Sequence, residues 1–285
     1  MEKIIILGAT GNIGIAVLKN LQGKKAEVFA GVQNEKKIDK VLKYGANPII
    51  VNFADQESLN NALRDMDRVF LVTPIMQNPL QITQNVINAI KLNGLKHFVR
   101  STAAGADSSG KIQMARWAGA SEDLIKASEI NYTLIRPHTF IQNFINFYIG
   151  SIKAQNSFYM PMDGARFAQL DVSDLGEIAA MALTTDDHFG KTYELSGLAY
   201  TGSELEQGLS WATGRKISYV AISDEQAHNS MVGNGMPEWI VSAMTELNYI
   251  MKMGYTDTYS EDFKNITGKE YRSANEFFET NKSLF

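Results

Sequence analysis

The chain has 285 residues, of which 45% are hydrophobic and 20% are charged, and its formal net charge is −4. This length suits one large α/β domain with a smaller appended lobe, and the slight acidic excess argues against a nucleic-acid-binding surface. Because cysteine is absent, disulfides, thiolate zinc ligands and cysteine nucleophiles are excluded. The four scattered histidines have no metal-ligand spacing.

The chain opens on an apolar run at residues 4–7 that is too short for the core of a signal peptide and is followed at once by glycine. No apolar run approaches the ~18–20 residues that a membrane span needs. We therefore expect a cytoplasmic protein that acts without membrane or nucleic acid, as a monomer or a homodimer.

Short apolar runs alternate with amphipathic stretches through the first half, which predicts a doubly wound parallel sheet of the Rossmann type. A dinucleotide-binding domain is expected over residues 1–150, and a smaller, mainly helical substrate lobe with elements returning to the sheet over 151–285. The expected strands are rich in β-branched residues, which suits burial on both faces; they cover residues 3–7, 27–31, 48–51, 68–73, 97–101 and 132–136.

Helix boundaries are readable at several places. One apolar helical face runs over residues 13–21 before Gly23, and another over 82–90 before Gly94. In the second half, a serine paired with an acidic or amide residue predicts three helix starts, and Gly214 is expected to end the second of these helices. The start signals are Ser173 with Asp174, Ser203 with Glu206, and Ser223 with Gln226. Residues 224–285 are expected to be mainly helical.

The strongest motif for chemistry is the glycine-rich turn directly after the first strand. Gly8 permits a tight turn, Gly11 lets the backbone approach a pyrophosphate, and Gly14 permits close helix packing. The following helix would present free N–H groups and its positive dipole end to phosphate. The expected cofactor-binding residues of this turn are Gly8, Thr10, Gly11, Asn12, Ile13 and Gly14. The alternative is an ordinary glycine-rich turn beside an empty crevice.

The spacing Gly-x-x-Gly-x-x-Gly resembles that of the extended and atypical short-chain dehydrogenase/reductases. Residues 71–74, 96–102 and 130–144, and the closing segments 266–270 and 275–278, resemble the NmrA-like group of these enzymes. Within that group the chain is similar to quinone oxidoreductases, triphenylmethane reductase and ergot-alkaloid dehydrogenases of the agroclavine and festuclavine type. The resemblance covers essentially the whole chain and implies a nicotinamide cofactor, with Thr73 and Pro74 beside it.

Cofactor choice depends on charge at the end of the second strand, where an acid selects NAD(H) and a basic residue selects NADP(H). NADPH-preferring relatives often carry Arg where Gln33 stands, followed by a lysine at Lys37. Gln33 cannot supply a charge-assisted bond to a 2′-phosphate, so binding of that phosphate should be weaker. No acid replaces it at the strand end, although Glu35 is close. NADP(H) is therefore favoured and NAD(H) is possible. Alternatively, Lys36 and Lys37 are only the solvated start of a helix.

The resemblance also implies where catalytic groups should lie, and the usual ones are missing. The Tyr-x-x-x-Lys pair of short-chain dehydrogenases should fall near Met114 and Ala118, and neither residue can donate a proton. Ser101 and Thr102 stand where the family has supporting hydroxyls; their alternative role is capping or hydrogen bonding at the strand end.

The loop after the sixth strand is the expected substrate side. His138 would polarise the substrate or supply a proton, with Phe140 and Asn143 contacting it. The alternative for His138 is an ordinary loop histidine, whereas His97 is expected to be structural. The methionines and aromatics of the C-terminal helices are expected to be mainly core.

The leading hypothesis is an NAD(P)H-dependent reductase that transfers hydride to a small aromatic acceptor such as a quinone, a dye or an iminium ion. Such acceptors need little acid catalysis, which suits a site without Tyr and Lys. The alternative is a cofactor-binding redox sensor or regulatory protein without turnover. A nucleotide-sugar epimerase shares the fold but needs the missing pair, and it ranks last.

Overall fold

The computed structural model describes residues 1–76 and 79–285. These residues divide into two compact units, each of which is described by itself. The first comprises Met1–Pro137 with Val172–Glu194, and the second comprises His138–Asp171 with Leu195–Phe285. The expected boundary after residue 150, between a cofactor domain and a substrate lobe, stays a prediction.

The first unit is built on a seven-stranded sheet with the order β3-β2-β1-β4-β5-β6-β9. Its strands are β1 (Glu2–Leu7), β2 (Ala26–Val32), β3 (Asn47–Ile50), β4 (Arg68–Leu71), β5 (His97–Ser101), β6 (Tyr132–Pro137) and β9 (Lys191–Leu195). The pairings from β3 through β6 are parallel. The doubly wound parallel fold is therefore confirmed, and the six predicted strands lie within two residues of their expected ends. Strand β9 lies outside the sequence prediction.

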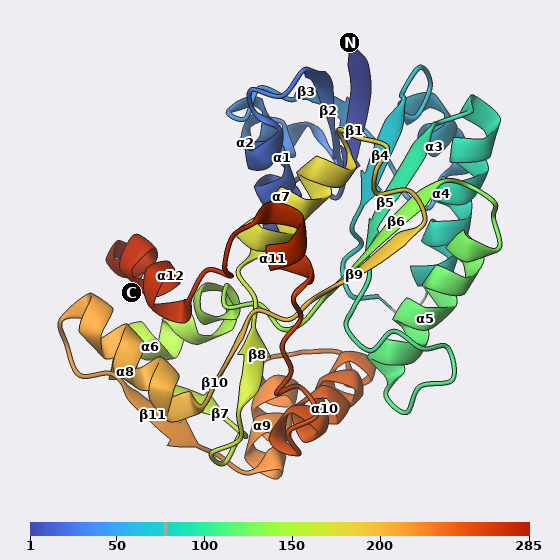
Figure 1. Cartoon of the computed structure of the whole chain (residues 1–285). Coiled ribbons are helices and arrows are strands. Elements are labelled where there is room, and N and C mark those ends of the chain that lie inside the picture. The colour runs from blue at the N-terminus through green and yellow to red at the C-terminus, as the bar shows by residue number, and fades with distance from the viewer. Residues whose placement is uncertain (77–78) are drawn as a thin grey trace. The chain divides into compact units, whose positions relative to one another are not determined.

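Helices cover both faces of this sheet. They are α1 (Asn12–Leu21), α2 (Asp39–Leu42), α3 (Gln56–Ala62), α4 (Pro79–Asn93), α5 (Gln113–Lys126) and α7 (Val172–Ala182). Figure 1 shows α1 and α7 on one face of the sheet and α3, α4 and α5 on the other. As predicted, α1 begins at Asn12, and Gly23 and Gly94 follow α1 and α4 with positive φ.

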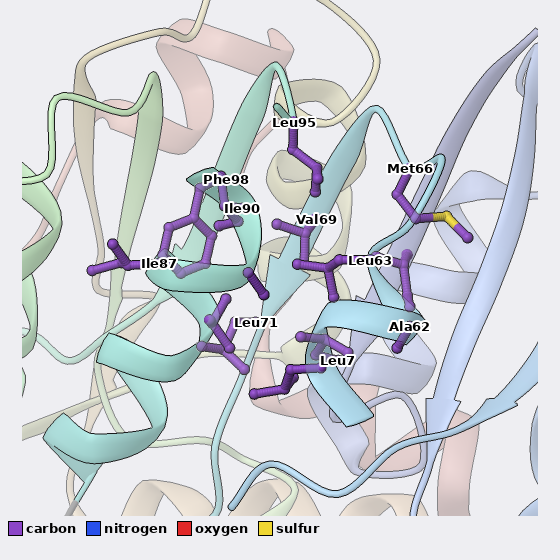
Figure 2. Close-up of a cluster of buried hydrophobic side chains, with 14 of the residues drawn as sticks. Leu7, Ala62, Leu63, Met66, Val69, Leu71, Ile87, Ile90, Leu95 and Phe98 are labelled. Carbon is purple, nitrogen blue, oxygen red and sulfur yellow. The ribbon is translucent and has the colours of Figure 1, made fainter. Parts of the chain in front are cut away.

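One hydrophobic core of the first unit lies between the sheet and the α3, α4 and α5 layer. Figure 2 shows Leu7, Val69, Leu71 and Phe98 of the sheet packed against side chains of the helices, among them Ile90. All five are at most 1% exposed, and burying each side chain of this size stabilises the fold by about 1.5–3 kcal/mol. The core therefore extends to the carboxyl ends of β1 and β4, next to the glycine turn.

The second unit is mainly helical. Its helices are a π-helical turn (Phe144–Tyr148), α6 (Ile149–Gln155), α8 (Gly202–Thr213), α9 (Asp224–Gly233), α10 (Glu238–Lys252), α11 (Asp262–Thr267) and α12 (Ala274–Asn281). Two short strand pairs accompany them, β8 (Phe167–Gln169) with β10 (Leu198–Tyr200) and β7 (Ser157–Met160) with β11 (Ser218–Ala221). The rings of Phe158 and Phe278 each lie 5.0 Å from that of Phe144. The C-terminal aromatics thus contribute to a core, as predicted.

Two of the three predicted helix starts are corrected by the structure. The capping box of α8 is formed by Thr201 and Glu204, not by Ser203 and Glu206. Glu206 instead accepts a hydrogen bond from the backbone N–H of Tyr219 at 2.7 Å, so it is unavailable for capping. The predicted end at Gly214 and the capping box of Ser223 with Gln226 are confirmed.

The third start, that of α7, also differs. This helix begins at Val172, so Ser173 and Asp174 lie within its first turn and do not precede it. The helix dipole favours an acidic side chain anywhere in the first turn, so the pattern does not fix which residue begins the helix.

Candidate functional site

The glycine turn has the geometry that its sequence predicts. Gly8 has φ +87°, and a Cβ there would lie 2.3 Å from the carbonyl oxygen of Val72. A Cβ on Gly14 would lie 2.3 Å from the carbonyl oxygen of Gly8, so this helical position tolerates only glycine. A Cβ on Gly11 would instead have a single near neighbour, at 3.7 Å, and Gly11 is exposed. The turn is therefore rigid at Gly8 and Gly14 and open at Gly11.

This open position marks the start of α1. Gly11 has extended backbone and is the residue before the first helical turn, which contains no acidic residue. The positive end of the helix dipole is therefore not neutralised within that turn. Thr10 is half-buried and Ile13 half-buried, while Asn12 is exposed. A cradle of this kind, open where backbone must meet phosphate and closed elsewhere, fits a dinucleotide pyrophosphate.

The structure joins the two residues predicted to decide cofactor choice. Gln33 directly follows β2, and Lys37 ends a short 3₁₀ helix at Glu35–Lys37. The Nζ atom of Lys37 donates a hydrogen bond to Oε1 of Gln33 at 3.0 Å, in an exposed position. An ammonium group therefore lies at the end of β2 through its bond to Gln33, although no arginine is present there.

The glycine turn follows β1, and the sheet order continues from β1 to β4 and then to β5. Thr73 is half-buried, and its Oγ1 accepts a hydrogen bond from Nη2 of Arg100 at 3.0 Å. Pro74 is exposed and has no N–H to donate, and β4 ends at Leu71, two residues before its predicted end. Ser101 ends β5 and is 5% exposed.

Thr102 belongs to a polar network beneath the end of β5. Its Oγ1 donates to Oε1 of Glu122 at 2.8 Å, and Arg136 donates to the same carboxylate at 2.8 and 2.5 Å. Lys126 lies 3.1 Å from Oε2 of Glu122. Burial alone would raise the pKa of Glu122, but the hydrogen bonds from Arg136 and Thr102 outweigh burial and lower it. Glu122 is therefore an anion at neutral pH, and it engages the Thr102 hydroxyl.

One face of α5 carries the positions where a Tyr-Lys pair was expected. Met114 and Ala118 are four residues apart in α5, and Glu122 follows four residues later, so all three lie on the same side of the helix. Met114 and Ala118 are half-buried. This side of α5 therefore carries one ionised carboxylate and no proton donor at residues 114 and 118.

The second unit contains the predicted substrate residues. His138 is half-buried; its backbone N–H donates to the carbonyl oxygen of Leu195 at 2.9 Å, and its Nε2 lies 3.2 Å from Oγ1 of Thr258. Burial lowers the pKa of His138, so its imidazole is neutral at pH 7. In this form it can donate one N–H hydrogen bond but is a poor source of a full proton.

Backbone hydrogen bonds hold the rest of this loop. The backbone N–H of Ile141 donates to the carbonyl of Leu170 at 3.0 Å, and Phe140 forms a parallel bridge with Leu170. The backbone N–H of Asn143 donates to the carbonyl of Phe140 at 3.0 Å, immediately before the π-helical turn. Phe140 and Asn143 are both half-buried. Their roles toward a substrate stay predictions.

Residues outside the predicted set also bear on the site. His97 is fully buried in β5, and its Nε2 lies 2.9 Å from Oγ1 of Thr133, which confirms its structural role. Arg100 was not singled out in the sequence, although a charged residue inside a strand buried on both faces is a visible signal. Among residues 1–76 and 79–285 no group of acids and histidines has metal-ligand geometry, and no helix is both long and apolar enough to cross a bilayer.

Comparison with known proteins agrees with the predicted family. The NmrA-like family model matches residues 1–278. The NAD(P)H azoreductase of Xenophilus azovorans is 33% identical over 283 residues, which is 99% of each chain. The predicted enzyme class and cofactor are those named for this relative.

Two solved structures share the fold. The triphenylmethane reductase of a Citrobacter species, complexed with NADP(H), has a TM-score of 0.85 and 24% identity over 98% of this chain and 99% of its own. The Escherichia coli quinone oxidoreductase QOR2 complexed with NADPH has a TM-score of 0.85 and 22% identity, over 97% and 99%. With the full-length family match and the glycine turn, these findings show that the chain belongs to the NmrA-like family.

Proposed function

We propose that this protein is an NAD(P)H-dependent reductase that transfers hydride to flat, electron-poor aromatic acceptors, such as quinones, azo and other dyes, or iminium ions. NADP(H) is the preferred cofactor. The observation that carries the proposal is the absence of a proton donor at residues 114 and 118 of α5, combined with a glycine turn shaped for a dinucleotide. A relative named as an azoreductase, at 33% identity over the whole chain, supports the choice of acceptor.

The residues of the first unit would bind and orient the cofactor, which supplies the hydride. The open backbone at Gly11 and the start of α1 would hold the pyrophosphate. Lys37, held by Gln33, would pair with a 2′-phosphate, and Thr73 and Pro74 would lie beside the nicotinamide ribose. The protein's contribution is then mainly positioning, which by itself accounts for a large rate enhancement.

The acid–base groups of the two units, each taken by itself, support an acceptor that brings its own driving force. The Thr102 hydroxyl donates a hydrogen bond to Glu122, and Glu122 is ionised. A neutral His138 can stabilise developing negative charge by donating one hydrogen bond, and it supplies no full proton at neutral pH. An iminium ion that accepts hydride becomes a neutral amine and needs no proton, and a quinone or an azo group can take its proton from water after the transfer. Simple ketones need a proton donor in the site.

The test follows deuterium from 4-deuterated NADPH into each class of acceptor. We expect transfer to a quinone and an azo dye, and little or none to an unactivated ketone or a nucleotide sugar. Gly11→Val, which should lose cofactor affinity, is the control that assigns turnover to this site. Rapid reduction of the ketone would contradict the proposal, and tight cofactor binding without transfer to any acceptor would favour the sensor alternative.

A second measurement concerns His138. His138→Ala should lower kcat/KM for the quinone by about ten- to a hundredfold, which is less than the loss of an essential general acid. Thr258→Val removes the hydroxyl at 3.2 Å from Nε2 and keeps the imidazole, so its effect should be smaller. If both variants keep the wild-type kcat/KM, His138 is an ordinary loop histidine.

A further inference from the structure

Arg100 is a buried cation at the carboxyl edge of the sheet. It is the fourth residue of β5 and pairs in register with Leu71, the last residue of β4. Because side chains alternate along a strand, Arg100 lies on the same face as Phe98, the face covered by α3, α4 and α5 (Figure 1). Only 4% of Arg100 is exposed.

The guanidinium group of Arg100 makes two contacts with neutral acceptors. Nη1 donates to the carbonyl oxygen of Leu71 at 3.3 Å, and Nη2 donates to Oγ1 of Thr73 at 3.0 Å. Both acceptors lie at or beyond the end of β4, so the guanidinium is directed toward the edge where open α/β sheets bind their ligands. Its Nε has no hydrogen-bond partner among the described residues.

Among the described residues, no acidic side chain pairs with Arg100. No ion pair of residues 1–76 and 79–285 includes it, and Gln77 and Asn78 are uncharged. Burial lowers its pKa to about 10, so the group is still a cation at neutral pH. Buried charges in proteins are ordinarily paired, because an unpaired one loses its hydration without compensation.

We propose that Arg100 is the counter-charge for an anionic group of a ligand bound at the carboxyl edge of this sheet. The matching groups are a carboxylate, a sulfonate or a phosphate, which a guanidinium binds through paired N–H donors. Such an anion has two sources, a charged substituent of the acceptor or a phosphate of the cofactor. The first source rests on the proposed function and would make Arg100 a specificity-determining residue for anionic aromatic acceptors.

The test compares two dyes, 4-(dimethylamino)azobenzene and the same dye bearing a 2′-carboxylate. Arg100→Met removes the charge and keeps much of the volume, and Arg100→Lys keeps the charge without the paired donors. If the acceptor supplies the anion, Arg100→Met should lower kcat/KM for the carboxylated dye at least tenfold more than for the neutral dye. Lys96→Met, which removes a cation at the opposite edge of the sheet, should leave this ratio unchanged.

Calorimetric measurement of NADPH and NADH binding shows whether the anion is instead a phosphate of the cofactor. A similar loss of affinity for both cofactors in Arg100→Met, with an unchanged dye ratio, assigns the anion to the cofactor pyrophosphate. If neither the dye ratio nor the cofactor affinity changes in a folded Arg100→Met variant, the proposal is overturned. Should that variant fail to fold, Arg100→Lys carries the same comparison, with an expected loss of at least threefold in the affected quantity.

Failure of the proposed function can be distinguished from failure of the Arg100 proposal. If the wild-type protein reduces neither dye, azo dyes are not its acceptors, but calorimetric binding of the carboxylated and neutral dyes to wild type and Arg100→Lys still tests Arg100. Preferential binding of the carboxylated dye to the wild type supports the proposal. Equal binding of both dyes to both proteins, together with unchanged cofactor affinity, contradicts it.

Discussion

Arg68 and Arg100 are arginines of neighbouring strands in one sheet, and both are almost fully buried, at 3% and 4% exposure. Arg68 begins β4, at the amino edge, where it bonds Glu2, Asp186 and the carbonyl of Thr185. Burial alone would lower the pKa of Arg68, but its hydrogen bonds to Glu2 and Asp186 outweigh burial and raise it. Arg100 has only neutral acceptors, and burial lowers its pKa to about 10.

The two arginines show that the two edges of the sheet differ in role. The amino edge, with Arg68, stabilises the fold, and the carboxyl edge, with Arg100, is suited to binding ligands. At the amino edge, Lys96 also pairs with Asp67 at 3.0 Å, and Asp67 in turn accepts from the backbone N–H of Lys3. At the carboxyl edge, the first turn of α1 contains no acidic residue, and Arg100 has no ion-pair partner among the described residues. Positive potential without its own anion is expected where an anion binds and is costly elsewhere.

The largest expected effect is on stability and contrasts the two arginines directly. Arg68→Met removes bonds to three partners and should lower the free energy of unfolding by about 2–4 kcal/mol. Arg100→Met removes a buried cation that has no counter-charge, so stability should stay within about 1 kcal/mol of the wild type or rise. Urea unfolding of both variants without ligand measures this. An equally large loss in the two variants would show that Arg100 is compensated within the protein.

Stability should also depend on pH through the amino edge. Burial, aided by the charge of Arg68, lowers the pKa of His97 to about 4, whereas the unfolded chain has a value near 6.5. Below pH 6.5 the unfolded state therefore binds a proton that the folded state does not, and stability falls until the pH reaches about 4. Between pH 7.5 and pH 5 the expected loss is about 2 kcal/mol.

His97→Gln isolates this effect, because glutamine retains a polar group for Thr133 but does not titrate in this range. Urea unfolding at both pH values should show a smaller pH-dependent loss in the variant than in the wild type. His188 also has a pKa lowered by burial, but it is present in both proteins. Equal slopes would mean that His97 titrates normally and is less enclosed than its geometry indicates.

Substitutions in the glycine turn test whether the carboxyl edge of the sheet binds the cofactor. Gly11→Val should weaken NADPH binding more than tenfold, about 1.4 kcal/mol or more, because a branched side chain blocks the approach of the pyrophosphate. Its free energy of unfolding should barely change, since a Cβ there meets only one atom, at 3.7 Å. Gly14→Val is the matched control and should disrupt folding. Unchanged affinity in folded Gly11→Val, measured by calorimetry, would remove this turn from the cofactor site.

The smallest expected effect concerns cofactor choice. Lys37→Ala should reduce NADPH affinity and leave NADH nearly unchanged, and Gln33→Arg should shift preference toward NADPH by about 1–2 kcal/mol. The Lys37–Gln33 hydrogen bond keeps the ammonium at the end of β2, which is the position that such discrimination needs. If both variants keep the wild-type NADPH/NADH ratio of affinities, Lys36 and Lys37 belong to a solvated helix start.

Much of the fold was predictable because its signals are local. Strands buried on both faces appear as continuous apolar runs, and glycines are required where Gly8 adopts positive φ and where Gly14 packs against the turn. Local patterns were less reliable where two signals overlapped. Both Thr201 with Glu204 and Ser203 with Glu206 match a capping box, and the contact of Glu206 with Tyr219, thirteen residues away, decided between them.

By itself, the sequence determined the parallel sheet, the glycine turn and the absence of Tyr and Lys at residues 114 and 118. It also named Gln33 and Lys37 as the residues that bear on cofactor choice, and the structure added the hydrogen bond between them. Only the tertiary structure decided which buried charges are compensated. Arg68 meets Glu2 and Asp186, which are 66 and 118 residues away, and Thr102 meets Glu122 from the next helix. Such pairs depend on how the strands are ordered across the sheet. The lack of an ion-pair partner for Arg100 among the described residues has the same origin, because Glu122, the acid at the end of β5, pairs with Arg136 and Lys126 instead.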